Sequence, residues 1–191
     1  HQPDLFTDVG AQPNAWADDD NDGDLDLFVG FRGRENRLYR NDQGTFTDVA
    51  GSVGLATQAV PEAETRAAAW GDYDGDGDLD AVVSNSGAAN KLWLNNSYGT
   101  FTDSAQSFGA NASTDIALAD VDGDSDLDMV VTNTSGQGNR VYTNNGTGTF
   151  TDSTQSLGTS NSTAVALGDL DNDGDVDAFV TNTGQANSVW K

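Results

Sequence analysis

Between residues 72 and 80 the chain reads Asp72-Tyr73-Asp74-Gly75-Asp76-Gly77-Asp78-Leu79-Asp80. Aspartate occupies the odd positions of this nine-residue stretch, glycine the sixth and an apolar residue the eighth. Similar stretches begin at residues 18, 120 and 169, and we call the four acidic loops 1 to 4 in chain order. Five carboxylates so close together repel one another unless a cation is present, so four solvated acidic turns explain the repeat poorly.

Alternating aspartates on a tightly curled loop are typical of calcium binding. Ca²⁺ takes roughly six to eight oxygen ligands, and a small residue at the sixth position lets the backbone turn toward the ion. We expect side-chain ligation from positions 1, 3, 5 and 9, backbone ligation from position 7, and up to four calcium ions. The predicted metal-ligating residues are Asp18, Asp20, Asp22, Asp24, Asp26, Asp72, Asp74, Asp76, Asp78, Asp80, Asp120, Asp122, Asp124, Asp126, Asp128, Asp169, Asp171, Asp173, Asp175 and Asp177.

The residues after each loop distinguish these loops from a helix-flanked calcium site. An EF-hand needs glutamate at position 12 and a helix on each side. Here position 12 is Val29, Val83, Val131 or Val180. Short apolar runs such as residues 81–83 follow the loops, and β-rich runs bounded by turn residues indicate buried strands. Each loop is therefore predicted to join one strand to the next.

Two further signatures complete a repeating unit. Asn-basic-aliphatic-aromatic occurs at residues 36–39, 90–93 and 139–142, and Phe-Thr-Asp follows at residues 46–48, 101–103 and 150–152. Turn residues lie between the two signatures, which predicts a hairpin. With one strand before the acidic loop and one after it, each unit has four strands. Loop starts at residues 18, 72, 120 and 169 are 54, 48 and 49 residues apart, a period typical of β-propeller blades.

The two ends of the chain carry parts of a unit. Residues 5–9 resemble a fourth strand without a third, and residues 187–191 resemble a third strand without a fourth. We therefore expect a single all-β domain over residues 1–191, a β-propeller of four-stranded blades with four repeats, closed by pairing of the N- and C-terminal strands. The alternative is part of a larger ring. The longer first spacing indicates an insertion around Thr57 to Arg66, where we expect a loop at first and then, before Trp70, the first strand of the second unit.

Composition excludes several classes of function. The formal net charge of −23 excludes a nucleic-acid partner, because phosphate backbones need a basic surface. No apolar run is long enough to predict a membrane span. The chain has no cysteine and one histidine, and its aspartates are mostly committed to metal, so we predict that it is not an enzyme. Few aliphatic residues and high charge are typical of disorder, so we expect bound calcium to stabilise the fold.

The motifs resemble those of a known family. Residues 71–80, read with the Asn-Arg-Leu-Tyr and Gly-Thr-Phe-Thr-Asp segments, are similar to FG-GAP/VCBS repeats, which are related to the calcium-binding blades of the integrin α-subunit propeller. The resemblance covers essentially the whole chain. It implies a β-propeller with Ca²⁺ between the first and second strands, and an extracellular, cell-surface or periplasmic location. Two departures are Ser125 at position 6 of loop 3 and Gly30-Phe31-Arg32 after the second strand of the first unit.

These observations lead to one functional expectation and two alternatives. We expect a calcium-binding, non-catalytic module that acts in adhesion, protein interaction or structure, or as a subunit of a multi-subunit assembly. The first alternative is a lectin-like carbohydrate-binding module, with recurring aromatics such as Trp16 and Trp93 as a stacking platform. Packing between blades is the simpler explanation of those aromatics. The second alternative is an accessory domain of a polysaccharide-active enzyme.

Overall fold

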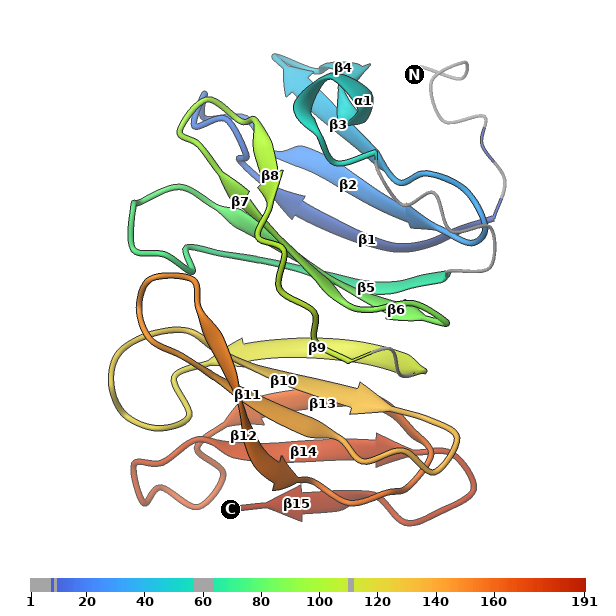
Figure 1. Ribbon diagram of the computed structural model, residues 1–191, viewed down its shortest axis with the longest axis vertical. Helices are drawn as coiled ribbons and strands as arrows, with labels where there is room; N and C mark the ends of the chain where they lie inside the picture. Colours follow the sequence, from blue (N-terminus) through green and yellow to red (C-terminus); the bar gives the residue numbers. More distant parts are fainter. Residues whose placement is uncertain (1–7, 9, 57–63, 110–111) are drawn as a thin grey trace.

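The computed structural model describes residues 8, 10–56, 64–109 and 112–191, which form four antiparallel sheets (Figure 1). Sheet 1 contains β1 (Ala11–Ala17), β2 (Asp26–Phe31), β3 (Arg37–Asp42) and β4 (Thr45–Asp48). Sheet 2 contains β5 (Glu64–Gly71), β6 (Asp80–Ser86), β7 (Lys91–Asn95) and β8 (Phe101–Asp103). Sheet 3 contains β9 (Ser113–Ala119), β10 (Asp128–Asn133), β11 (Arg140–Asn144) and β12 (Phe150–Ser156). Sheet 4 contains β13 (Ser162–Gly168), β14 (Asp177–Asn182) and β15 (Ser188–Trp190).

Every sheet is a meander in which strands that follow one another in sequence also pair in space. In sheet 2, Ala81 of β6 lies opposite both Trp70 of β5 and Trp93 of β7. Each acidic loop joins the first strand of its sheet to the second, as predicted. The strand expected before Trp70 is confirmed as β5, which begins at Glu64 within the insertion. The loop expected in the first part of the insertion stays a prediction, because residues 57–63 lie outside the described residues.

The four sheets stack in chain order (Figure 1). Their first strands make the contacts along the stack: β1 touches β5, β5 touches β9 and β9 touches β13. All four first strands line one open hollow of about 450 Å³, which is bordered by Gln12, Arg66, Thr114 and Thr163 among others. Four meanders with their first strands around one hollow are consistent with propeller-like blades.

The predicted closure by the terminal strands stays a prediction, because residues 1–7 and 9 lie outside the described part of the chain. Sheets 1 and 4 form opposite ends of the stack in Figure 1. Asp8, from the expected N-terminal strand, lies beside sheet 1, where its carboxylate pairs with Arg34 at 2.8 Å and with Arg37 at 3.3 Å. Over the described residues, sheet 4 has three strands and no closed ring is formed.

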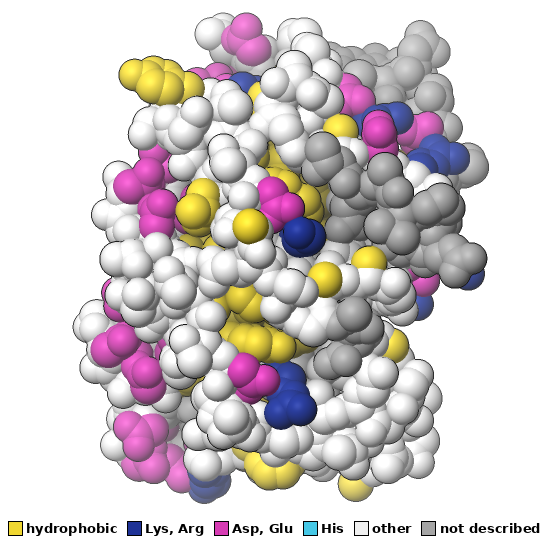
Figure 2. Space-filling model, viewed as in Figure 1, with side chains coloured by type: hydrophobic (Ala, Val, Ile, Leu, Met, Phe, Trp, Pro, Cys, Tyr) yellow, Lys and Arg dark blue, Asp and Glu magenta, His cyan; other side chains and the backbone are white. Residues whose placement is uncertain are grey.

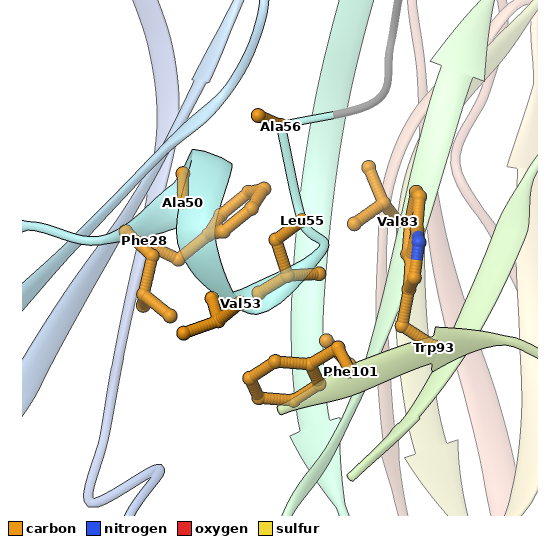
Figure 3. Close-up of a cluster of buried hydrophobic side chains, with 10 residues drawn as sticks. Phe28, Ala50, Val53, Leu55, Ala56, Val83, Trp93 and Phe101 are labelled. Atoms are coloured by element: carbon orange, nitrogen blue, oxygen red, sulfur yellow. The ribbon is translucent and has the colours of Figure 1, made fainter. Parts of the chain in front are cut away.

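A cluster of buried hydrophobic side chains fills the space between sheets 1 and 2 (Figure 3). Phe28 and Leu38 of sheet 1 meet Val83 and Trp93 of sheet 2 in this cluster. A second cluster joins sheet 2 to sheet 3 and includes Val82. Successive residues of a strand point to opposite faces, so the adjacent valines of β6 serve different interfaces. This explains why the second strands are continuous apolar runs rather than alternating ones.

A short helix, α1 (Ala50–Val53), was not expected from the sequence. It follows β4 and buries Ala50 and Val53 in the cluster between sheets 1 and 2. The helix ends at Gly54, whose φ of 95° is left-handed. A Cβ on Gly54 would lie 2.5 Å from the carbonyl oxygen of Phe101, so the close approach of the helix end to β8 requires glycine here. Over the described residues, no helix has the length and apolar character that crossing a membrane requires.

Candidate metal centres

The four acidic loops lie along one edge of the stack, because each connects the same two strands of a similarly oriented sheet. Figure 2 shows many Asp and Glu side chains gathered along this edge, at the left of the view. Basic side chains are few in the chain, with 8 Lys and Arg against 31 Asp and Glu. The edge therefore concentrates negative charge and attracts cations.

Three carboxylates converge in every acidic loop. In loops 2, 3 and 4 they come from positions 1, 3 and 9, and one oxygen atom from each lies within 4.8 Å of the others. In loop 1 they come from positions 1, 3 and 5. The converging residues are Asp18, Asp20 and Asp22; Asp72, Asp74 and Asp80; Asp120, Asp122 and Asp128; and Asp169, Asp171 and Asp177. Three negative charges at this spacing favour a divalent cation between them.

The aspartate at position 1 is oriented by the backbone of its own loop. In loop 2, Asp72 Oδ1 accepts the N–H of Gly75 at 2.8 Å and Oδ2 accepts the N–H of Gly77 at 3.0 Å. Loops 3 and 4 repeat both bonds with the residues at positions 4 and 6. In loop 1 the donors are instead the residues at positions 5 and 6. The loop thus curls around a carboxylate that keeps lone pairs free for a metal.

The aspartate at position 9 ties the loop to the third strand. Asp80 is fully buried, and its Oδ2 accepts the N–H of Tyr73 at 2.9 Å while its Oδ1 accepts the N–H of Asn95 at 2.7 Å. Asp26 and Asp128 make the same pair of bonds in their sheets. Burial raises the pKa of Asp80 to about 6, although the two N–H groups oppose that shift. A buried carboxylate of this kind gains from a nearby cation.

Two positions of each loop adopt the left-handed backbone conformation. Position 6 has a φ of 95° in Gly23, 95° in Gly77, 77° in Ser125 and 98° in Gly174. Position 4 is also left-handed, with φ between 60° in Asn21 and 83° in Gly123. Position 4 was not singled out from the sequence, although it is restricted to asparagine and glycine, the residues that tolerate this conformation best.

The aspartates at positions 5 and 7 stand apart from the converging carboxylates in loops 2, 3 and 4. Asp76 Oδ1 accepts the N–H of Asp78 at 3.0 Å, and the equivalent bond recurs in the other loops. The position-7 carboxylate of Asp78 accepts Asn21 Nδ2 of loop 1 at 2.8 Å. Ligation by position 5 and by the position-7 carbonyl stays a prediction for Asp76, Asp124 and Asp173 and for Asp24, Asp78, Asp126 and Asp175. Asp26 likewise stays a predicted ligand.

Basic side chains accompany the loops of the two end sheets. Arg40 pairs with Asp19 at 2.6 Å and with Asp20, the third position of loop 1, at 3.3 Å. Lys191 pairs with Asp171, the third position of loop 4, at 2.6 Å, and lowers the pKa of that carboxyl. Both basic residues occupy the same place in the repeat, four residues after the signature asparagine, although Lys191 lies one residue beyond the end of β15.

Loop 1 contains two carboxylate oxygens without partners. The Oδ1 atoms of Asp19 and Asp20 are buried, and no hydrogen bond reaches them from the described residues. Asp19 is fully buried, and this burial raises its pKa to about 7 despite the guanidinium of Arg40. Buried acceptors are normally satisfied, so the orphaned oxygen of Asp20 fits a metal ion placed among Asp18, Asp20 and Asp22.

Two loops are also held by the following sheet. Asn95 Nδ2, from the end of β7, donates to the backbone carbonyl of Asp19 in loop 1 at 2.8 Å. Asn144 Nδ2, from the end of β11, donates to the carbonyl of Tyr73 in loop 2 at 2.9 Å. The backbone N–H of each asparagine also donates to the buried position-9 carboxylate of the acidic loop in its own sheet. One asparagine therefore links two successive loops, which couples their geometry.

Comparison with known proteins agrees with the repeats. A family model described as an FG-GAP-like repeat matches residues 18–83, 72–131 and 120–180. Each match begins at an acidic loop and extends through the next loop into the strand after it, so the matches together run from residue 18 to residue 180. Among curated proteins, no sequence matched the chain.

Proposed function

The chain belongs to the FG-GAP-like repeat family, and on that basis we propose that it is a calcium-binding, non-catalytic module built from β-propeller blades. The module works outside the cytoplasm and binds other proteins, as an adhesive or structural unit or as a subunit of a larger assembly. The observation that carries the proposal is the convergence of three carboxylates in every acidic loop.

Calcium fits these loops better than magnesium. Several carboxylates and backbone carbonyls on a flexible loop provide the many oxygen ligands that Ca²⁺ accepts in irregular geometry. Mg²⁺ needs near-ideal octahedral geometry and usually keeps several waters, so it gains less from a dense carboxylate cluster. Repeats of this family commonly bind calcium, which supports the same ion.

A bound ion has a structural task in this chain. It neutralises the mutual repulsion of clustered carboxylates such as Asp72, Asp74 and Asp80. It also fixes the loop whose position-2 carbonyl accepts the asparagine of the next sheet, as Tyr73 does from Asn144. Calcium therefore stabilises each loop and, through it, the contact between neighbouring sheets.

The chemistry of the loops supports a binding role rather than a catalytic one. The carboxylates at positions 1 and 9 already accept backbone N–H groups, as Asp72 and Asp80 show, so they are poorly placed to exchange protons with a substrate. A rigid stack of sheets offers surfaces for protein contacts. Calcium is abundant outside cells and scarce in most cytoplasms, which supports an extracellular, cell-surface or periplasmic setting for sites of ordinary affinity.

Isothermal titration with CaCl₂ tests the proposal. We expect saturable calcium binding and a loss of at least one site in Asp80→Asn, because this substitution removes a carboxylate from the loop 2 cluster. Asp152→Asn is the matched control, since Asp152 is an exposed strand residue outside the loops, and it should bind as the wild type does. An unaltered titration in Asp80→Asn, or no binding at millimolar calcium, would contradict the proposal.

A further inference from the structure

Each inner sheet buries two different faces. We call the face turned toward the next sheet the forward face, and in sheet 1 it carries Phe28 of β2 and Leu38 of β3. We call the face turned toward the preceding sheet the backward face, and in sheet 2 it carries Trp70 of β5, Val83 of β6 and Trp93 of β7. All of these side chains belong to one apolar cluster. The interface between sheets 1 and 2 therefore joins a forward face to a backward face.

The interface between sheets 2 and 3 repeats this arrangement. Leu92, the counterpart of Leu38, lies in one buried cluster with Tyr142, the counterpart of Trp93. Aromatic rings cross both interfaces: Phe28 and Trp70 have centroids 6.4 Å apart, and Tyr73 and Phe150 have centroids 5.7 Å apart. The chain thus uses the same positions each time one sheet docks on the next.

The forward face of sheet 4 has no described sheet against it. Phe179 and Val189 occupy the positions of Phe28 and Leu38, yet they are 37% and 50% exposed, whereas those counterparts are 1% and 0% exposed. Leu170 of acidic loop 4 adds a side chain that is 54% exposed. Figure 2 shows hydrophobic surface at the lower end of the stack, which sheet 4 forms in Figure 1.

Over the described residues, the backward face of sheet 1 is open as well. Trp16 occupies the position of Trp70 and is 51% exposed. It borders an apolar hollow of about 320 Å³, which Leu27, Val29 and Tyr39 also line. At the internal interfaces the equivalent surface receives the forward face of the preceding sheet, so the hollow has the place and chemistry of an unfilled docking site.

A polar contact of the internal interfaces is also incomplete at this end. Asn95 crosses to the carbonyl of Asp19 in the preceding loop. Asn41 is the equivalent residue of sheet 1, and its Nδ2 donates to the carbonyl of Leu25 within the same sheet at 3.2 Å. Asn95 bonds position 2 of the loop in the sheet that docks on its own sheet. If sheet 4 docked on sheet 1 in the same way, the acceptor for Asn41 would be the carbonyl of Leu170, at position 2 of loop 4.

We propose that the forward face of sheet 4 binds the backward face of sheet 1 of a second copy of this chain, in the register that joins sheets 1 and 2 within a copy. Phe179 of one copy packs on Trp16 of the next, and Asn41 donates to the carbonyl of Leu170. The two faces are different surfaces, so the contact is head-to-tail and leads to a closed ring or an open filament.

The distribution of exposed apolar side chains supports this partner. The large hydrophobic side chains that are exposed among the described residues number six, and four of them lie on these two faces: Trp16, Leu170, Phe179 and Val189. Exposed apolar groups mark an interaction site better when they are concentrated than when they are scattered. Here they are concentrated on two faces whose repeat positions meet at the internal interfaces. A sheet of the same type fits the hollow because such a sheet fills the equivalent space at the internal interfaces.

One internal contact has no counterpart at the new interface. In sheet 3 Ser113 Oγ donates to Asn133 at 2.9 Å, and Asn90 of the preceding sheet donates to that hydroxyl at 3.0 Å. In sheet 1 the corresponding pair is Ala11 opposite Phe31, which can make neither bond. We therefore expect the contact between copies to be weaker than the internal ones and to depend on protein concentration.

Analytical ultracentrifugation in one calcium-containing buffer, over a wide range of protein concentration, tests the proposal. The wild type should associate as its concentration rises. Phe179→Asp blocks only the forward face and Trp16→Asp only the backward face, so each should weaken self-association roughly tenfold or more, since the contact would bury an unpaired carboxylate. Tyr98→Asp is the matched control, because Tyr98 is 83% exposed on an inner sheet, and it should associate as the wild type does.

Mixing the two end-face variants distinguishes a head-to-tail contact from other kinds. Phe179→Asp keeps an intact backward face and Trp16→Asp keeps an intact forward face. The mixture should therefore form a 1:1 dimer that does not grow further, while each variant alone stays monomeric at the same concentration. Val189→Asp, at a half-exposed side chain, repeats the forward-face test if Phe179→Asp melts differently from the wild type.

Two outcomes would overturn the proposal. The first is a wild type that stays monomeric at every concentration, or association that neither end-face variant weakens. The second is a disulfide formed within one chain of the double variant Trp16→Cys and Phe179→Cys, in a protein without other cysteines. That result would show that the two faces meet by closing the ring inside a single copy.

Discussion

Acidic loops 2 and 3 differ from acidic loops 1 and 4 in their nearest positive charges. All four bring three carboxylates together. Arg40 lies 3.3 Å from Asp20 in loop 1, and Lys191 lies 2.6 Å from Asp171 in loop 4. The corresponding residues of sheets 2 and 3 are Leu94 and Thr143. Within the described residues, no basic side chain forms an ion pair with the aspartates of loops 2 and 3.

Equal numbers of carboxylates therefore do not make equal metal sites. A guanidinium or ammonium group beside position 3 already neutralises part of the charge that a metal ion would neutralise, so the ion must share that carboxylate or displace the basic group. Loop 1 differs further, because its cluster contains position 5 in place of position 9. We therefore expect loops 2 and 3 to hold the stronger calcium sites and loops 1 and 4 to fill later.

Removal of calcium should have the largest effect. An ion at a free concentration ~100-fold above its dissociation constant stabilises the folded state by about 2.7 kcal/mol per site, so even the two stronger sites would add on the order of 5 kcal/mol. We expect a chelator to lower the thermal midpoint strongly, with circular dichroism as the readout. Partial titration should restore most of that loss before loops 1 and 4 fill. Equal thermal midpoints with and without chelator would show that calcium does not stabilise the fold, and the comparison of the four loops as calcium sites would then have no basis.

Substitution of the buried position-9 aspartate should come next in size. Asp80→Asn and Asp26→Asn each replace a carboxylate that accepts two backbone N–H groups with an amide that has one acceptor oxygen. Both should lose about 1–3 kcal/mol of unfolding free energy without calcium. With calcium, Asp80→Asn should lose more than Asp26→Asn, since only Asp80 joins its cluster. Urea unfolding measures both, and equal losses in calcium would remove the difference between the loops.

Removal of a competing basic group should have a smaller effect of opposite sign. Lys191→Thr copies the residue that sheet 3 carries at this place, and it should strengthen calcium binding at loop 4 without affecting the fold, because Lys191 is exposed. Lys91→Thr is the matched control, since it breaks an exposed ion pair with Asp103 outside the loops. Titration calorimetry should show tighter binding in the first variant only. Weaker binding in Lys191→Thr would mean that the lysine supports the site.

The smallest effect should come from the sixth position of loop 3. Ser125 has a left-handed φ of 77°, which costs a side-chain-bearing residue roughly 1 kcal/mol, partly offset by the greater freedom of glycine in the unfolded chain. Ser125→Gly should therefore raise the thermal midpoint slightly and tighten calcium binding. Ser97→Gly, at a φ of 70° outside the loops, should raise stability to a similar degree and leave calcium binding unchanged. If Ser97→Gly also tightened calcium binding, the gain in affinity could not be assigned to the sixth position of loop 3.

The local features of this fold were predictable from the sequence because their signals are local. The apolar run Ala81-Val82-Val83 indicated a strand buried on both faces, and β6 is such a strand between two clusters. The aspartate spacing indicated convergence, and positions 1, 3 and 9 do converge in three of the four loops. In each case a few neighbouring residues contain the information.

The features that the sequence analysis missed depend on residues far apart in the chain. Arg40 pairs with Asp20 of loop 1 and also donates to the carbonyl of Gly99, which lies in the turn between β7 and β8, and no spacing rule reports this second contact. Helix α1 exists because the space between sheets 1 and 2 is filled by Ala50 and Val53, although four residues have little helical preference of their own. The open faces at Trp16 and Phe179 were visible only once the sheets were stacked.

Anomalous X-ray scattering from crystals grown with calcium locates bound ions, so it shows whether the acidic loops hold calcium and which loops hold it best. We expect peaks in loops 2 and 3, at roughly 2.3–2.6 Å from carboxylate oxygens of Asp72, Asp74, Asp120 and Asp122, with weaker peaks in loops 1 and 4. Intact sheets with no peak in loops 2 and 3 at millimolar calcium would contradict this expectation.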